Sequence, residues 1–161
     1  MTVTAIWLVG VLAATAPSGA TQGPAEVTQI SEVSSVSAVI NQSGRGQSAF
    51  VDQSSASAAV AVLSQRGTGN FASVDQGGCA GCSANIARAF QLGSGDSVVI
   101  RQSGAGNTAE AVQVGSGDQA AILQTGTGNS AMSTQIGNGA PAITITQTGG
   151  AAVSVVQFGH K

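Results

Sequence analysis

The chain has 161 residues, of which 7% are charged and 3% aromatic, and it contains 23 glycines. That length suits one domain, but the large apolar residues are too few and too scattered for a conventional packed core. The low charge argues equally against a solvated, disordered chain. Five basic residues spread singly and a formal net charge of -2 provide no electrostatic footprint for nucleic acid or anionic lipid.

The N-terminal residues resemble an export signal. An apolar run over residues 5–14 is too short to span a bilayer but has the length of a signal-peptide core, and small residues follow at 18–20. We therefore predict a signal peptide over residues 1–20 and a mature chain that begins at Thr21. The basic start of a typical signal is missing, and the alternative is a buried apolar segment. Residues 21–35 are predicted to form a flexible N-terminal leader.

Glutamines recur without a slip at Gln91, Gln102, Gln113, Gln124 and Gln135. Each of the first four opens a unit of the form Q-x-G-x-G followed by Asn or Asp and about five residues of strand pattern. We call each such unit an arc. The Asn and Asp arcs alternate, so the true repeat is two arcs, or 22 residues. Less perfect copies extend this repeat region to residues 36–157, with a tail at 158–161. The spacing breaks near residues 77–91, which we interpret as a point where part of a repeat is lost.

Within each arc, side chains alternate between two faces in the manner of a strand. Two residues before each glutamine that ends an apolar strand there is a large aliphatic residue. These residues are Ile40, Leu63, Ile100, Ile122 and Ile145. Most charged residues lie at the alternate positions of the strands, whose side chains point to the other face. One face is therefore aliphatic or amide, and the other faces water.

A unit of two short strands and two tight turns cannot bury its apolar face alone, so the units must stack. The paired glycines provide the positive φ values that the turns require. The sequence thus predicts an all-β fold, a β-solenoid of 22-23-residue strand-turn-strand repeats that forms two facing parallel sheets. In such a stack each buried amide meets its own copy in the next repeat and forms an amide ladder.

The repeat Q-x-G-x-G-N-x-A-x-x-x-Q behind a signal peptide resembles the curlins, the subunits of bacterial curli fibres, over residues 36–157. The resemblance implies a secreted protein that polymerises into an extracellular amyloid fibre on the bacterial cell surface, serving adhesion and biofilm matrix. It implies as partners further copies of the chain, another curlin subunit, an outer-membrane export pore that reads residues 21–35, and a periplasmic chaperone. Whether the chain is a major or a nucleating subunit stays open. The ladder residues map onto Gln42, Gln53, Gln65, Gln76, Gln102, Gln113, Gln124, Gln135, Gln147, Gln157, Asn70, Asn107 and Asn129.

Charge is distributed unevenly along the repeats. Residues 119–159 contain no Asp, Glu, Lys or Arg. Because uncharged strands of high β-propensity favour zipper formation, we hypothesise that the two C-terminal repeats drive growth. Four aspartates would then act as gatekeeper charges that slow aggregation during export, namely Asp52, Asp75, Asp96 and Asp118.

Few residues suggest chemistry. Cys79 and Cys82 form one C-x-x-C pair, which lacks the four ligands of a structural zinc site. In an exported chain we interpret them as a small disulfide loop, with free thiols or intermolecular pairing as alternatives. His160 has no partner acid or nucleophile at any motif spacing. We therefore predict no catalytic residue, no metal site, no cofactor and no enzymatic activity.

A second function class is a monomeric secreted β-solenoid that binds ice or glycans. It would need a regular outward ladder, such as Thr-x-Thr on successive repeats. Thr144 and Thr146 supply this pattern once.

Overall fold

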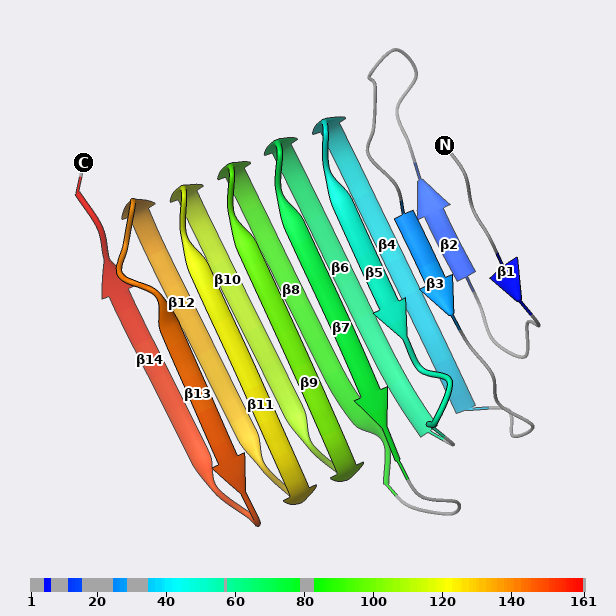
Figure 1. The fold of residues 1–161 in the computed structure, drawn as a ribbon. Helices are drawn as coiled ribbons and strands as arrows, with labels where there is room; N and C mark the ends of the chain where they lie inside the picture. The colour runs from blue at the N-terminus through cyan, green and yellow to red at the C-terminus, as the bar shows by residue number, and fades with distance from the viewer. Residues whose placement is uncertain are drawn as a thin grey trace.

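A computed structural model describes residues 5–6, 12–15, 25–28, 35–56, 58–78 and 83–160. Every regular element in these ranges is a β-strand. Within them no helix is long and apolar enough to cross a membrane. The strands form two seven-stranded sheets, and successive strands alternate between the sheets (Figure 1).

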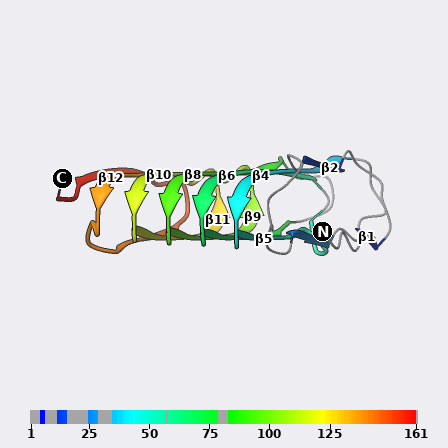
Figure 2. The same ribbon diagram turned by 90° about the horizontal axis from the view of Figure 1, so that it is seen from above.

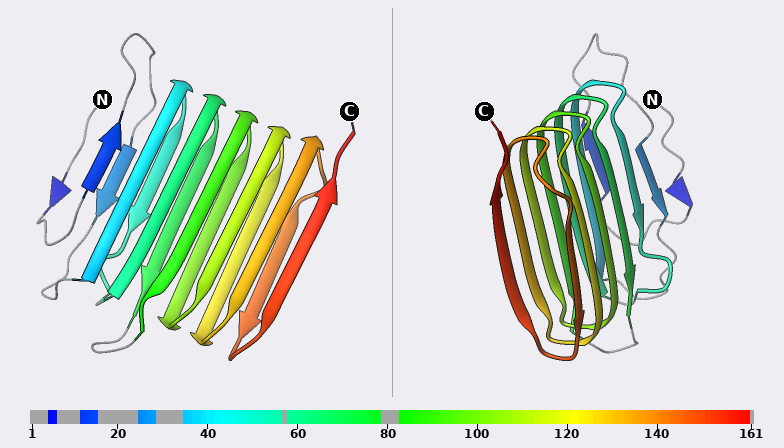
Figure 3. Two further views of the ribbon diagram at one scale, coloured as in Figure 1. Left: turned by 180° about the vertical axis from the view of Figure 1, so that it is seen from behind. Right: turned by 60° about the vertical axis from the view of Figure 1, so that its left-hand side comes forward.

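Sheet A contains the odd-numbered strands, β1 (Ala5–Ile6), β3 (Ala25–Thr28), β5 (Ser48–Asp52), β7 (Phe71–Gly77), β9 (Ser97–Ala105), β11 (Gln119–Thr127) and β13 (Ile143–Thr148). Sheet B contains the even-numbered strands, β2 (Leu12–Thr15), β4 (Ser35–Arg45), β6 (Ala58–Thr68), β8 (Asn85–Ser94), β10 (Thr108–Ser116), β12 (Ser130–Asn138) and β14 (Ala152–Phe158). We call one sheet B strand and the sheet A strand that follows it a rung. The rungs are stacked copies of one coil, as the two views in Figure 3 show.

All pairs between named strands are parallel, and their register places like residues opposite each other. In the pair β10–β12, Gln113 lies opposite Gln135 and Gly115 opposite Gly137. In the pair β9–β11, Ile100 lies opposite Ile122. This arrangement confirms the predicted β-solenoid with two facing parallel sheets, because the repeat length equals one full turn of the coil.

The two sheets face each other across a thin interior (Figure 2). Burial alternates along the inner strands, such as β6 and β11, as the sequence pattern predicts, because successive side chains point to opposite faces. The interior residues between the glutamines are aliphatic and mostly small. Those that form the buried core cluster include Ala38, Ile40, Ala61, Leu63, Ala72, Val74, Val98, Ile100, Ala109, Ala111, Ala120, Ile122, Ala131, Ile143 and Ile145.

The irregular segment near residues 77–91 does not interrupt the stack. Strand β7 ends at Gly77 and β8 begins at Asn85, and β8 pairs along its length with both β6 and β10. Our interpretation that part of a repeat is lost here is therefore wrong. The extra residues lie between the two strands, so the register of β8 is preserved. Cys79 and Cys82 lie outside the described residues, and their disulfide stays a prediction.

Strand β3 lies within the segment that we expect to be a leader. Its residues pair in parallel with β5, so that Ala25 lies opposite Ala49 and Val27 opposite Val51. The repeat pattern does not mark this strand, because residues 21–35 have no glycine pair of the repeat type. Strands β1 and β2 pair with β3 and β4, and the signal peptide over residues 1–20 stays a prediction.

Candidate functional site

The interior contains two continuous rows of glutamines. The sheet B row runs through Gln42, Gln65, Gln91, Gln113 and Gln135, and the sheet A row through Gln53, Gln76, Gln102, Gln124 and Gln147. Within each row the amide nitrogen Nε2 of one glutamine donates to the amide oxygen Oε1 of the next. The distances are 2.8–2.9 Å in the sheet B row and 2.7–2.8 Å in the sheet A row.

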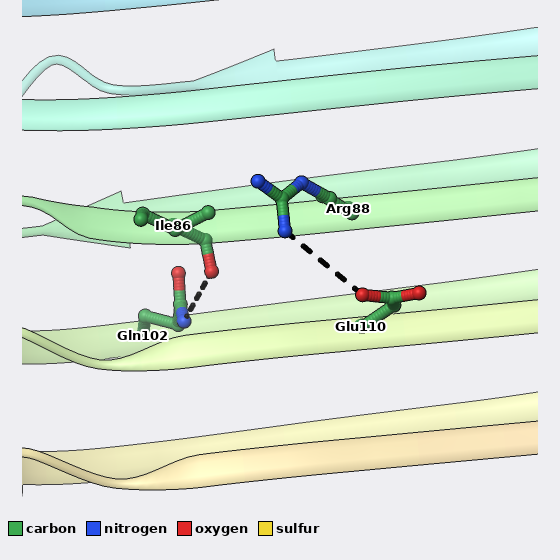
Figure 4. Close-up of polar contacts among 4 residues, drawn as sticks. All are labelled: Ile86, Arg88, Gln102 and Glu110. Atoms are coloured by element: carbon green, nitrogen blue, oxygen red, sulfur yellow. Dashed lines mark hydrogen bonds and ion pairs between the residues drawn. The ribbon is translucent and has the colours of Figure 1, made fainter.

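Most of these glutamines also tie the two sheets together. The Nε2 of Gln102 in β9 donates at 3.0 Å to the backbone oxygen of Ile86 in β8 (Figure 4), and that of Gln124 in β11 donates at 2.9 Å to Thr108 in β10. Since a carbonyl can only accept, this second bond fixes which end of the amide carries the nitrogen. Most glutamines of the two rows are therefore hydrogen-bonded both along the stack and across it.

The sheet B row ends differently from the prediction. Gln157 lies opposite Gln135 in the β12–β14 register. However, the Nε2 of Gln135 donates at 2.9 Å to the backbone oxygen of Pro141, and the Oε1 of Gln157 has no hydrogen-bond partner. The segment from Gln135 to Gln147 contains one residue more than the equivalent segment from Gln113 to Gln124. That extra residue brings a carbonyl into the interior, where it replaces the next glutamine.

The asparagines form two rows on opposite edges of the coil. Asn85, Asn107 and Asn129 precede or begin the strands of sheet B, and their Oδ1 atoms accept from the backbone N–H one rung on, at 3.0–3.2 Å. Asn70 lies in the other row, in front of the strands of sheet A, where its Oδ1 accepts at 3.1 Å from the N–H of Asp96. The structure thus separates Asn70 from Asn107 and Asn129, which the sequence treats as one set.

The four aspartates predicted as gatekeepers occupy two different environments. Asp52 and Asp75 lie opposite each other on the outer face of sheet A and are exposed. Asp96 and Asp118 are 1% and 0% exposed and continue the row of Asn70. Burial and then the neighbouring Asp118 carboxyl raise the pKa of Asp96, although backbone hydrogen bonds partly oppose this.

Three further residues belong to these rows that sequence reasoning missed. Gln91 fills the sheet B row between Gln65 and Gln113. Asn85 opens the asparagine row of sheet B. Gln47 takes the place of an asparagine before β5, where its Nε2 donates to Ser43 and Gly67. The eleven-residue register already contained Gln91, and Gln47 stands five residues after Gln42, as Asn70 stands after Gln65.

The outer faces carry few groups that could act chemically. Arg88 and Glu110 form an ion pair at 4.0 Å on sheet B (Figure 4). In the described part of the chain, no group of His, Cys, Asp or Glu could hold a metal ion. The outward rows that contain Thr144 and Thr146 continue into Ala121 and Leu123 on the next strand. Among the described strands, these two rows of the outer face therefore do not form a threonine ladder, although Thr125 lies opposite Thr148 in the same strand pair.

Comparison with known proteins finds a family match in the repeats whose spacing is most regular. Residues 104–137 match the family described as "Curlin associated repeat". No curated protein and no solved structure matches the chain. The matched segment spans β10 and β11 with most of β12, and its register continues into the rungs on both sides. Residues 104–137 are therefore similar to the curlin-associated repeat, in the part of the chain where the glutamine spacing is most regular.

Proposed function

We propose that the chain is the structural subunit of an extracellular curli-like amyloid fibre, which grows by stacking rungs of successive copies. The observation that supports this most is the pair of glutamine rows. Each buried amide takes its partner from the rung above or below, so the interior of one rung is complementary to another copy of itself. The surface roles that we propose, adhesion and biofilm matrix, require no catalytic group.

The C-terminal rung offers an interior face that a second copy could cover. Val153 lies in the same inward row as Ala131, yet it is 40% exposed whereas Ala131 is 2% exposed. Strand β14 pairs with β12 on one side only among the described strands. Covering this face would remove apolar surface from water at about 25 cal/mol per Å².

At the other end of the stack, the predicted removal of residues 1–20 would leave β4 without β2. If β14 of one copy paired with β4 of the next in the register of the glutamines, Gln157 would meet Gln42. The same register would place Val155 over Ile40 and Val153 over Ala38. These pairs reproduce the aliphatic contacts that the rungs make within the chain, such as Ile40 over Leu63.

The direct test is fibre diffraction from the chain that begins at Thr21, purified in denaturant and then diluted. We expect a meridional reflection at about 4.7 Å, the spacing of hydrogen-bonded strands. An aggregate without that reflection contradicts the amyloid proposal.

A matched pair of variants tests the stacking mode. Val153→Asp places a charge on the inward row of β14, which is exposed in one copy but buried between copies. Val156→Asp places the same charge on the outward face of the same strand, at a residue that is 55% exposed. We expect Val153→Asp to stop elongation on preformed fibres and Val156→Asp to permit it. Equal elongation of both variants contradicts stacking through β14.

We further propose that the charge-free C-terminal rungs drive growth and that the aspartates restrain it. A chain that ends at Asp118 should form fibres more slowly than the full chain in thioflavin kinetics. Equal rates would show that this division of labour is wrong. Another curlin subunit, an export pore that reads residues 21–35 and a periplasmic chaperone are the partners that the family suggests, and co-expression with and without each of them tests the assignment.

A monomeric ice- or glycan-binding solenoid is the second candidate. The rows containing Thr144 and Thr146 change to alanine and leucine one rung away, so no observation favours it.

A further inference from the structure

Asp96 and Asp118 occupy positions where the neighbouring rungs use neutral side chains. They follow Asn70 in the row that precedes the sheet A strands, and Ala140 comes after them. Both carboxyls are almost completely buried. A carboxylate in such a place is costly unless it is paired or protonated.

Asn70 shows what the position requires. Its Oδ1 accepts from the next rung, and its Nδ2 donates at 3.1 Å to the backbone oxygen of Arg66 and at 3.2 Å to that of Gly93. One side-chain atom is therefore an acceptor for the stack. The other is a donor that fastens the turn to its own rung and to the next.

The aspartates fulfil only the first of these roles. The Oδ1 of Asp96 accepts at 3.1 Å from the N–H of Asp118, and the Oδ1 of Asp118 accepts at 3.0 Å from the N–H of Ala140. The Oδ2 atoms of both are buried and have no hydrogen-bond partner among the described residues. An ionised carboxylate has no donor to offer at this atom, whereas a protonated one has an O–H.

Among the buried residues that the structure describes, there is no Lys, Arg or His to compensate the pair. Asp118 is the titratable group that faces Asp96, and the flanking members of the row, Asn70 and Ala140, are uncharged. The inward amides of the adjoining sheet B strands are Gln91 and Gln113. Charged side chains on the surrounding strands lie on outward faces, namely Arg66, Asp75, Arg88, Arg101 and Glu110.

We propose that Asp96 and Asp118 form a proton-operated clasp between the turns that precede β9 and β11. When the pair takes up a proton from solvent, a carboxylate becomes a carboxylic acid, and its O–H donates to backbone carbonyls as the Asn70 amide does. When the pair loses the proton, buried like charges face each other one rung apart and the donor is lost. Mild acidity then favours the folded rungs, and neutral pH loosens them.

The direction of the effect follows from linkage. Because the pKa of Asp96 is raised above its ordinary value of 3.8, the folded state binds a proton more tightly than the unfolded chain. The stabilisation is fully present below that ordinary value and is lost as the pH rises through the pKa of the folded state. Each unit by which the pKa of Asp96 is raised corresponds to about a tenfold change in the folding equilibrium constant.

The test compares two double variants that remove the same charge. Asp96→Asn with Asp118→Asn restores the donor at the buried row, and Asp52→Asn with Asp75→Asn neutralises the outer face. The Asp52 Oδ1 that accepts from the Ser54 N–H is retained as an amide oxygen. The matched pair also controls for general aggregation near the isoelectric point, because both variants change the net charge equally.

Guanidinium unfolding of the chain from Thr21, followed by circular dichroism, would be measured at about pH 5 and about pH 8, both above the ordinary pKa of an aspartate. We expect a higher midpoint at the lower pH for the native chain and for the outer-face variant. The buried variant should be equally stable at both. A pH difference that survives in the buried variant, or a native chain with none, overturns the proposal.

Infrared spectroscopy provides a readout that a purely structural role would not change. At the lower pH the native chain should show the carbonyl stretch of a protonated carboxyl, and the buried variant should lack it. A native spectrum identical to that of the buried variant overturns the clasp. These measurements concern the fold of each chain, so they decide the clasp even if fibres do not form, and failure of fibre formation alone counts only against the proposed function.

Discussion

The amide nitrogen of Gln102 lies 2.8 Å from the amide oxygen of Gln124, the glutamine one rung further along the chain. Gln102 in turn accepts at 2.8 Å from Gln76. A single glutamine therefore completes the hydrogen bonding of two others. Removing its amide should leave buried polar atoms without partners both above and below.

Gln102→Leu should destabilise the fold by roughly 1–3 kcal/mol for each buried group that it orphans. The outward Gln119 on β11 is the matched control, because Gln119→Leu removes an exposed amide and should change stability by less than about 0.5 kcal/mol. Guanidinium unfolding of both variants measures the difference. Equal stability would mean that the row contributes register but little free energy.

Gly115→Ala tests the steric requirement of stacking. A Cβ on Gly115 would lie 1.5 Å from the backbone oxygen of Gly137 on the next rung, whereas a Cβ on Gly117 meets nothing within 4 Å. Gly117 has a φ of 71°, so Gly117→Ala should cost about 1–2 kcal/mol of backbone strain. Gly115→Ala should cost more, since backbone must move. A smaller loss at Gly115 in thermal unfolding would contradict the close approach of the rungs.

Ser133→Ala should stabilise the protein. Ser133 is fully buried in the row that contains Ala111, and its Oγ has no hydrogen-bond partner. Replacing it by alanine should increase the free energy of unfolding by about 1 kcal/mol. Ser130→Ala, at an exposed position on the same strand, serves as control. A destabilised Ser133→Ala variant would indicate that the hydroxyl is satisfied.

Glu110→Gln should have little effect. The Arg88–Glu110 pair is 4.0 Å long, and its side chains are 54% and 37% exposed. Pairs of this kind contribute about 0–1 kcal/mol and are screened by salt. Unfolding at low and high ionic strength checks this. A larger, salt-sensitive loss would show that the outer face is held by charge.

The repeat length and the alternation of side chains along the strands were sufficient to predict the two sheets and the residues that face the interior. Ile100 and Ile122 are buried, Asp75 and Arg101 are exposed, and like glutamines stack, because alternation has only two phases. A repeat of 22 residues also fixes the rung length. These features depend on local patterns that are copied along the chain.

The edges of the coil could not be predicted in the same way. Asn70 and Asn107 have the same local sequence pattern but lie on opposite edges, because successive arcs belong to different sheets. Asp118 looks like a surface charge in a turn, yet stacking buries it. Similarly, Pro141 displaces Gln157 from its row through one added residue. Each outcome depends on neighbours that are more than one arc away.

Both glutamine rows run in one direction. From Gln42 to Gln135 and from Gln53 to Gln147, every link in the rows donates from the earlier rung to the later one, and backbone carbonyls such as that of Ile86 hold the amides in that orientation. The amide hydrogen bonds of both rows therefore point the same way along the stack, from the N-terminal rungs toward the C-terminal rungs. Two copies that met by like ends would oppose donor to donor or acceptor to acceptor, and only head-to-tail contact would continue the chain of amides.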